Sequence, residues 1–390
     1  MSPKNAGNSN GKKLRVAVLY GGRSGEHEIS LRSAASVIRN LDPERFEVVP
    51  IAIDKQGRWL LNDISLIEKN TQSLPMDQNL PPVVLPPNPV SGQSQLMPLS
   101  GNGSGKMAPM TAIDVVFPVM HGPLCEDGTI QGFLELADVP YVGCGTLSSA
   151  VGMDKDIAKR LIQAAGLPVV PAVALKHEPW KKNPQAAAQK IATELGYPVF
   201  VKPANLGSSV GVHKVKTPEE LDAALKDAFR FDTKVLVEKA VSAREIELAV
   251  LENPDPGLDA MVSAPGEVAP TGHEFYSYEA KYLDENGAAL MIPAKLAPEQ
   301  LARAQYIARE AFRALECEGL ARVDLFLDKT TGEFYFNEVN TMPGFTSISM
   351  YPKMWEASGI GYQELLTRLI DLAMARHARK RALVRDFHQS

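Results

Sequence analysis

The 390-residue sequence contains only three cysteines, and they are scattered along the chain. Cys125, Cys144 and Cys317 form no Cys-x-x-Cys pair, so the pattern predicts neither a disulfide framework nor a zinc site. No apolar run approaches the ~20 residues that span a bilayer. Residues 1–13 lack the apolar segment of a signal peptide and are predicted to be a disordered tail. These absences indicate a cytoplasmic protein with no membrane partner.

A strong excess of charge of either sign is also missing. The chain has 41 Lys and Arg against 46 Asp and Glu, which gives a net charge of -5. No general attraction to nucleic acid is therefore expected. Hydrophobic residues make up 45% of the chain, as in globular proteins. Its length suits two or three domains.

The first ordered segments alternate between strand and helix patterns. Residues 14–20 and 46–53 are typical of buried strands, and residues 29–41 between them have helical periodicity. This order predicts an α/β unit with a Rossmann-like parallel sheet. Residues 70–110 are rich in Pro, Asn, Gln, Ser and Gly, which predicts a long exposed loop or insertion. A buried strand resumes at residues 113–119.

The second half mixes hairpins with helices, which is typical of α+β architecture. Hydrophobic periodicity predicts three further helices, at residues 154–165, 184–195 and 362–381. Short apolar runs predict strands at residues 169–175, 235–238 and 245–251.

A glycine- and serine-rich segment follows another predicted strand, residues 198–203. Lys202 lies near the end of this strand, and Gly207-Ser208-Ser209-Val210-Gly211 comes shortly after. The segment is either a tight hairpin turn or a loop that presents N–H groups and hydroxyls to phosphate, with the lysine adding positive charge. A Walker sequence is absent.

A second glycine-rich run, Gly21-Gly22-x-x-Gly25, follows the first predicted strand. It does not satisfy the Gly-x-Gly-x-x-Gly pattern of dinucleotide-binding folds. Its loop carries acidic side chains, Glu26 among them, which would repel a pyrophosphate. The run therefore disfavours a nicotinamide cofactor.

Residues 320–328 and 333–340 alternate in polarity and predict a hairpin. Folding it about Thr331 sets four polar side chains on one face, with the Asp opposite the Glu and the Arg opposite the Asn. These residues are Arg322, Asp324, Glu338 and Asn340. Two carboxylates and an amide oxygen suit Mg²⁺ or Mn²⁺. The alternative is an exposed face with a cross-strand salt bridge.

Taken together, these segments resemble the ATP-grasp superfamily. Longer matches are similar to the D-alanine–D-alanine ligases, and the similarity runs from about Leu14 to the last helix. The matching segments are residues 21–30, His121-Gly122 followed by Glu126-Asp127-Gly128, residues 278–282 and residues 340–347.

The resemblance implies a Rossmann-like substrate domain followed by a two-lobed ATP-grasp fold. The implied divisions are residues 14–151, a central lobe at 152–232, a C-terminal lobe at 233–376 with a lid at about 264–293, and a tail at 377–390. It also implies a homodimer. The implied reaction joins two D-alanines for peptidoglycan precursors, through an acyl phosphate formed with ATP and two Mg²⁺ or Mn²⁺ ions.

The resemblance further implies a role for individual residues. Metal ions would be held by Asp324, Glu338 and Asn340. ATP would be bound by Lys155, Lys202, Gly207, Ser208, Ser209, Glu238, Lys239, Ala240, Val241 and Glu245. D-Alanine would be bound by Glu26, His121, Lys281, Tyr282, Arg322, Gly344 and Ser349. Catalysis would depend on Glu26, His121, Ser208, Tyr282, Arg322 and Gly344.

Several points stay open in the sequence. Cys125 stands where the family pattern has glycine, and its side chain is expected to tighten the loop behind His121. The basic end of the last helix, at residues 376–381, is expected to complement the helix dipole rather than bind nucleic acid. Alternative functions are a D-alanine–D-lactate or D-alanine–D-serine ligase, another ATP-grasp ligase, or a non-catalytic ATP-binding regulator.

Overall fold

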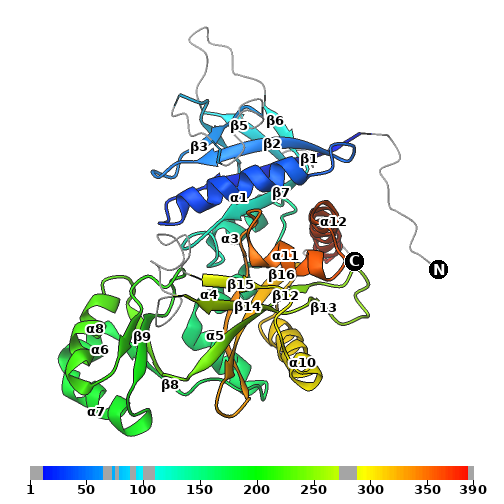
Figure 1. The fold of residues 1–390 in the computed structure, drawn as a ribbon. Helices are drawn as coiled ribbons and strands as arrows, with labels where there is room; N and C mark the ends of the chain where they lie inside the picture. The colour runs from blue at the N-terminus through cyan, green and yellow to red at the C-terminus, as the bar shows by residue number, and fades with distance from the viewer. Residues whose placement is uncertain are drawn as a thin grey trace.

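The computed structural model describes residues 12–64, 73–74, 79–87, 94–99, 110–271 and 288–384. Its strands form four sheets, and helices pack against them (Figure 1). No helix in these described ranges is long and apolar enough to cross a membrane.

The N-terminal sheet has the strand order β3-β2-β1-β7. β1 (Leu14–Gly21) pairs in parallel with both β2 (Phe46–Ile53) and β7 (Val115–Met120), while β3 (Trp59–Leu61) adds an antiparallel edge. α1 (His27–Asn40) connects the first two strands and packs against the sheet. The predicted strand–helix–strand unit is confirmed.

The segment predicted as a long exposed loop contains a small antiparallel sheet. β5 (Ser94–Pro98) pairs with β4 (Val83–Val84) and with β6 (Thr111–Ile113). Leu74 and Leu96 are 2% and 1% exposed. The exposed-loop prediction was wrong for these described residues, because isolated apolar side chains in a polar segment are enough to anchor short strands.

Three helices lead from the N-terminal sheet toward the central lobe: α3 (Thr129–Leu136), α4 (Thr146–Met153) and α5 (Lys155–Ala164). α5 begins one residue after the predicted start, Asp154, which is its N-cap. The side chain of Asp154 accepts a hydrogen bond of 3.1 Å from the backbone N–H of Ile157 and caps the helix.

The central lobe is an antiparallel sheet of order β10-β9-β11-β8. Its strands are β8 (Ala172–Lys176), β9 (Val199–Pro203), β10 (His213–Val215) and β11 (Lys234–Lys239). The helices of this lobe are α6 (His177–Lys182), α7 (Pro184–Glu194), the 3₁₀ helix η1 (Pro218–Glu220) and α8 (Leu221–Ala228). Apolar residues of strands and helices form one core cluster.

The C-terminal sheet has the order β15-β14-β12-β16-β17, with β13 paired to β12. Its strands are β12 (Ala243–Leu251), β13 (Met261–Val262), β14 (Gly266–Pro270), β15 (Ala288–Met291), β16 (Leu320–Asp328) and β17 (Phe334–Asn340). The helices are α10 (Pro298–Ala314), α11 (Met350–Ala357) and α12 (Tyr362–Arg381). α12 has the bounds that the sequence predicts.

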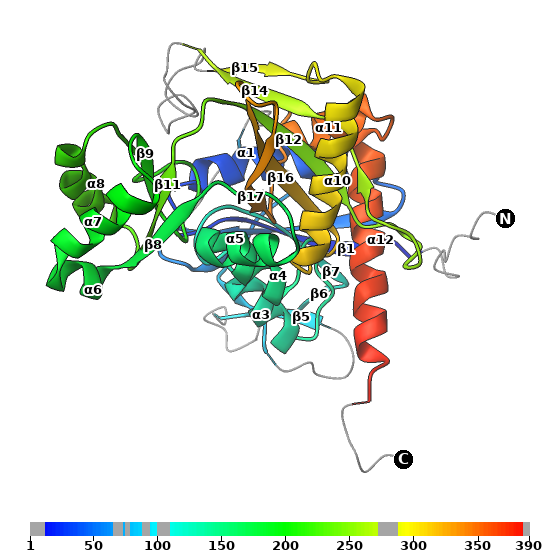
Figure 2. The ribbon, with the colours of Figure 1, turned by 90° about the horizontal axis from the view of Figure 1, so that it is seen from below.

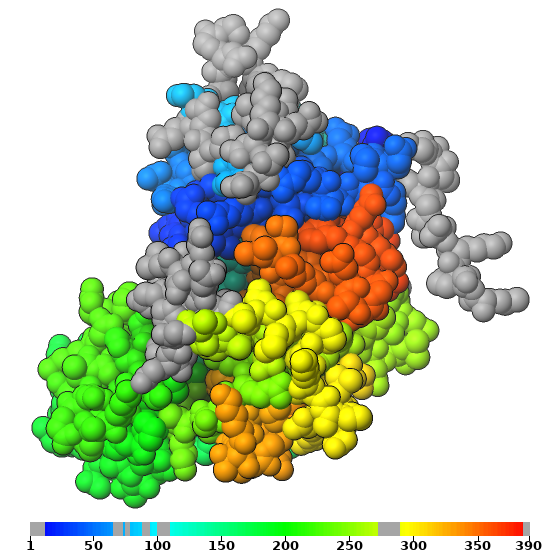
Figure 3. All heavy atoms as spheres, in the orientation of Figure 1, coloured from blue at the N-terminus to red at the C-terminus, as the bar shows by residue number. Residues whose placement is uncertain are grey.

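α12 lies beside the N-terminal sheet and on the opposite side of the molecule from helices α6–α8 (Figure 2). Its buried leucines share one core with β1 and β7. The N-terminal and C-terminal parts therefore form one packed body, and the central lobe projects from it (Figure 3).

The basic end of α12 forms specific contacts with the N-terminal part. The buried Arg376 donates a hydrogen bond of 2.7 Å to the carbonyl oxygen of Tyr141. His377 lies 3.0 Å from the Asp138 carboxylate. The helix-dipole explanation was therefore incomplete. The predicted tail also begins too early, because residues 377–381 are helical.

Candidate active site

Nearly all of the predicted site residues line one cavity of about 1530 Å³. It is bordered by the N-terminal part, the central lobe and the C-terminal sheet, which Figure 3 shows in blue, green and yellow to orange. Lys281 and Tyr282 lie outside the described residues. The other predicted residues, from Glu26 to Ser349, all contribute to its wall.

The C-terminal hairpin has the predicted pairing. Arg322 of β16 is opposite Asn340 of β17, and Asp324 is opposite Glu338. A β-bulge follows Asp324, so that Asn337 is the extra residue of β17. The bulge brings Glu338, rather than its neighbour, opposite the aspartate.

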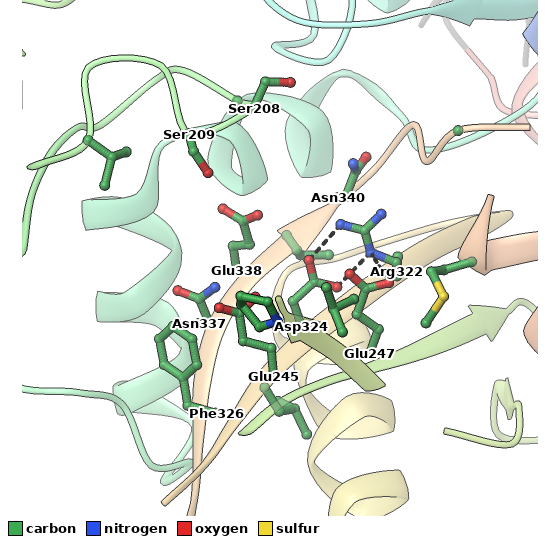
Figure 4. A pocket seen from close by; sticks show the side chains of 18 of the residues that line it. Ser208, Ser209, Glu245, Glu247, Arg322, Asp324, Phe326, Asn337, Glu338 and Asn340 are labelled. Atoms are coloured by element: carbon green, nitrogen blue, oxygen red, sulfur yellow. Dashed lines mark hydrogen bonds and ion pairs between the residues drawn. The ribbon is translucent and has the colours of Figure 1, made fainter. Parts of the chain in front are cut away.

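The partly buried Arg322 guanidinium lies between two carboxylates (Figure 4). Its Nε and Nη2 each donate a 2.7 Å hydrogen bond to Asp324, and Glu247 lies 3.2 Å from Nε. Burial lowers the pKa of Arg322, but the charges of Asp324 and Glu247 outweigh it and raise this pKa well above its usual value. The alternative prediction, a cross-strand salt bridge on an exposed face, is met only in part: the bridge to Asp324 lies within β16, the bridge to Glu247 crosses to β12 rather than β17, and all three side chains line the cavity.

Lys155 connects the hairpin to the glycine- and serine-rich loop. Its Nζ lies 3.2 Å from the Glu338 carboxylate and donates a 2.9 Å hydrogen bond to the carbonyl oxygen of Leu206. In Figure 4 the loop with Ser208 and Ser209 lies over the side of the hairpin from which Glu338 projects. A phosphate chain bound between loop and hairpin would meet this lysine.

The oxygen donors of the hairpin fit a hard divalent cation. Asp324 and Glu338 supply carboxylates, and the Asn340 side-chain oxygen is oriented by a 2.9 Å hydrogen bond from the backbone N–H of Met342. Such donors suit Mg²⁺ or Mn²⁺. Within the described ranges, no group of three or more His, Cys, Asp or Glu side chains is placed to hold a metal ion. The hairpin, with two carboxylates and an amide, remains the best candidate.

Glu238 is 2% exposed and lies between two lysines. One carboxylate oxygen is 2.8 Å from Lys159 Nζ, and the other contacts Lys202 Nζ. Burial raises the pKa of Glu238, but the two ammonium groups outweigh it and hold this pKa at about 2. Glu238 is therefore an anion at the cavity wall, next to the lining residues Lys239, Ala240 and Val241.

The Gly207–Gly211 loop is part of a hairpin connection, as one sequence-based interpretation predicts, and the phosphate-binding interpretation stays a prediction. It connects β9 and β10, which pair as an antiparallel hairpin, and its first three residues line the cavity. Ser208 and Ser209 have φ angles of 55° and 57°, and Gly211 has φ of 69°. A Cβ at Gly211 would lie 2.7 Å from the Phe231 ring, so glycine is required for this turn.

The opposite end of the cavity is formed by loops. Glu26 precedes α1 and accepts a hydrogen bond from the Ser208 hydroxyl of the central lobe. His121, 4% exposed, follows β7, and its Nδ1 lies 3.6 Å from Glu126. Burial lowers the pKa of His121, but Glu126 and Glu26 outweigh it and raise this pKa above its usual value.

The loop after β17 completes this end. Gly344 and Ser349 line the cavity, and the Ser349 hydroxyl accepts a 2.9 Å hydrogen bond from the Thr346 backbone N–H. A Cβ at Gly344 would lie 2.9 Å from the Ser349 oxygen, closer than such atoms normally approach. Cys125 is buried, and its sulfur would lie 3.8 Å from a Cβ added at Gly22; its predicted effect on the loop behind His121 stays a prediction.

Two family models match the chain and together cover most of it. The model described as "D-ala D-ala ligase N-terminus" matches residues 15–144, and the model described as "D-ala D-ala ligase C-terminus" matches residues 161–371.

The chain belongs to the D-alanine–D-alanine ligase family.

Individual relatives of the family agree with this result. The chain is 57% identical to a D-alanine–D-alanine ligase A from Bradyrhizobium diazoefficiens, over 96% of this chain and 99% of the relative. The structure of the ligase from Coxiella burnetii is similar, with a TM-score of 0.76, 35% identity, and coverage of 95% and 96%. A D-Ala:D-Ser ligase from Enterococcus faecalis matches with a TM-score of 0.79, 38% identity, and coverage of 93% and 100%. Membership implies an enzyme that uses ATP.

Three residues at or behind the cavity wall were not predicted from the sequence. They are Lys159, Glu247 and Glu126. Lys159 is four residues after Lys155, and this spacing on one helix face was an available signal. Glu247 is two residues after Glu245 on β12, which is the spacing of one strand face. Glu126 had no signal beyond its place in a matched segment, since only the fold brings it to His121.

Proposed function

We propose that this chain joins two D-alanine molecules in a reaction driven by ATP. The observation that supports this most directly is the convergence, in one cavity, of the Asp324–Glu338 carboxylates, the lysines Lys155 and Lys202, and the Glu26–Ser208 pair. A metal-nucleotide end and an amino-acid end would then share one cavity, as a carboxylate–amine ligase requires.

ATP would lie between the central lobe and the C-terminal sheet. Lys155, Lys202 and the loop from Gly207 to Ser209 would contact its phosphates. Glu238 and the backbone of Lys239–Val241 would face the adenine, and Glu245 the ribose hydroxyls. Asp324, Glu338 and Asn340 would hold two Mg²⁺ or Mn²⁺ ions, which when bound neutralise charge on the phosphates.

The reaction would proceed in two steps that both place negative charge on oxygen. The carboxylate of the first D-alanine takes the γ-phosphoryl group, and the amine of the second then attacks the acyl phosphate and releases phosphate. Arg322 would stabilise the developing charge, and the backbone N–H of Gly344 would donate to the oxyanion. Arg322 suits this role because it is held rigidly by Asp324 and Glu247.

The amino-acid end would select D-alanine. Glu26 would bind the first ammonium group, with Ser208 orienting Glu26 and His121 close to the first substrate. Lys281 and Ser349 would bind the second carboxylate. Tyr282 belongs to the lid proposed for residues 264–293, which would exclude water from the acyl phosphate.

The decisive experiment is phosphate release from Mg·ATP with D-alanine, L-alanine, D-lactate or D-serine, in parallel reactions. Of the four parallel reactions, we expect only the one with D-alanine to release phosphate, and we expect D-alanyl-D-alanine as its product. Because one structural relative is a D-Ala:D-Ser ligase, mixtures of D-alanine with D-serine are the critical comparison. A mixed product in preference to the D-alanine dipeptide would contradict the proposal.

We also propose a cytoplasmic homodimer, divided into units at residues 14–151, 152–232 and 233–376. Light scattering after size-exclusion chromatography tests the dimer, and a mass of one chain at micromolar concentration would contradict it. Limited proteolysis tests the unit boundaries.

A further inference from the structure

Lys159 is a buried lysine close to the cavity but behind its wall. It lies on α5, is 4% exposed, and is not one of the described residues that line the cavity. Its Nζ is 2.8 Å from Glu238 and donates a 3.2 Å hydrogen bond to the carbonyl oxygen of Phe336 on β17. Lys159 therefore contacts Glu238, a residue of the cavity wall, from the side away from the cavity.

The two lysines of Glu238 differ in their access to a ligand. Lys202 contacts one carboxylate oxygen and also lines the cavity, so its ammonium group can turn to an incoming phosphate. Lys159 contacts the other oxygen and has no such access. When a ligand binds, the Lys202–Glu238 ion pair can therefore be replaced by a contact between Lys202 and the ligand, whereas the Lys159–Glu238 ion pair cannot.

Movement of Lys202 from Glu238 to a phosphate would be unfavourable if no second cation stayed beside the Glu238 carboxylate. A carboxylate as buried as Glu238 is strongly destabilised when its last partner leaves, and it then takes up a proton or retains the partner. In either case, ATP would bind less well, because the purine edge would lose its acceptor or the phosphates would lose Lys202.

We propose that Lys159 is a positioning residue that acts as the permanent counter-ion of Glu238. It keeps Glu238 ionised and oriented toward the purine, and it allows Lys202 to leave Glu238 for the ATP phosphates. This inference rests on the proposed function, because it assumes that ATP binds in this cavity. Lys159 would then determine ATP affinity without touching ATP.

The test is a double-mutant cycle with K159M, E238Q and K159M/E238Q. The control is K190M, at an exposed lysine on α7 of the central lobe. Titration calorimetry gives the Kd of Mg·ATP, and steady-state kinetics give kcat and the KM values of ATP and D-alanine. Thermal unfolding shows whether each variant is folded.

We expect K159M to raise the Kd and KM of ATP at least about tenfold, as a lower bound for removing one partner of a buried ion pair. The KM of D-alanine should change less than about twofold, and K190M should resemble the wild type. In the E238Q background, K159M should have an effect below about twofold, because both substitutions act on one interaction. Effects that multiply, or equal changes in all kinetic constants, would overturn the inference.

Three further outcomes are informative. If K159M does not fold but K159M/E238Q does, the buried charge of Glu238 is the cause, which supports the inference; if neither folds, Lys159 is structural and the inference is wrong. If the wild type itself binds no ATP, the proposed function fails instead, so the two failures are distinguishable.

Discussion

The two ends of the cavity are constructed differently. The end proposed to bind metal and nucleotide lies mostly on paired strands: β9, β11, β12, β16 and β17 carry Lys202 and the carboxylates, and Lys155 is the first residue of α5. The amino-acid end is made of loops after β1, β7 and β17, joined by long-range contacts such as Ser208 to Glu26. Strand pairing fixes side chains at regular spacing, whereas loops bring residues from distant parts of the chain together.

This difference separates the reaction type from the substrate choice. A charged hairpin and buried ion pairs can serve many carboxylate substrates, so under the proposed function the strand end would specify activation by ATP. The loop end contains the side chains that would recognise one amino acid. Substitutions at the strand end should therefore lower the turnover number or the metal and ATP affinities, and substitutions at the loop end should change the KM of D-alanine.

The largest effect is expected for Arg322→Met. Loss of one preorganised donor to a developing oxyanion typically lowers kcat on the order of 10²–10³-fold. Phosphate-release assays at saturating substrates measure this change. R303M, at an exposed arginine of α10, is the control. A twofold difference in turnover is easily resolved by this assay. If R322M turns over within about twofold of the wild type, Arg322 does not stabilise the developing charge.

Glu338→Gln should act on metal dependence. The substitution removes a carboxylate charge. Mutation of even an outer-sphere partner of a metal site typically lowers metal affinity about 10–100-fold. We expect the Mg²⁺ concentration for half-maximal activity to rise at least about tenfold, and EDTA to abolish wild-type activity reversibly. An unchanged Mg²⁺ profile would show that the hairpin does not bind the ion.

Glu26→Gln tests the loop end. A hydrogen bond to a charged group contributes roughly 1.5–3 kcal/mol, so the KM of D-alanine should rise about 10–100-fold. The KM of ATP should stay close to the wild-type value, and E44Q, at an exposed glutamate, is the control. If the KM of ATP rises as much as that of D-alanine, the proposed separation of the two ends is incorrect.

The smallest effect concerns His121 and pH. Its folded-state pKa is raised above 6.5, chiefly because the hydrogen bond and charge of Glu126 outweigh burial. The stabilisation from protonated His121 is therefore complete below pH 6.5 and is lost as the pH rises through the raised pKa. NMR titration should show this raised pKa in the wild type and a lower one in E126Q.

E194Q, at an exposed glutamate of α7, should leave the His121 titration unchanged. The unfolding free energy of the wild type relative to H121N, measured in urea at several pH values, should decrease over the same interval. A flat difference between pH 6 and 9 would show that His121 is not stabilised as a cation.

Much of the fold could be predicted from local patterns. The bounds of β2 and α12 and the pairing of Asp324 with Glu338 follow from hydrophobic periodicity and strand geometry. The strands within residues 70–110 could not be predicted, because their short apolar anchors are stabilised only by contacts with distant residues. The same holds for Arg376, whose burial depends on carbonyl groups more than 200 residues away.

The sequence by itself determined the strand pairing of the Arg322–Asn340 hairpin, the candidate phosphate loop and, through its resemblance, the family. Each of these depends on residues close in the chain, where periodicity is sufficient. The tertiary structure alone decided that Lys159 lies behind Glu238, that Glu126 raises the pKa of His121, and that Ser208 meets Glu26. The contacts of Lys159 with Glu238 and of Ser208 with Glu26 join residues far apart in the chain, and the electrostatics of all three contacts depend on burial, which a linear pattern does not contain.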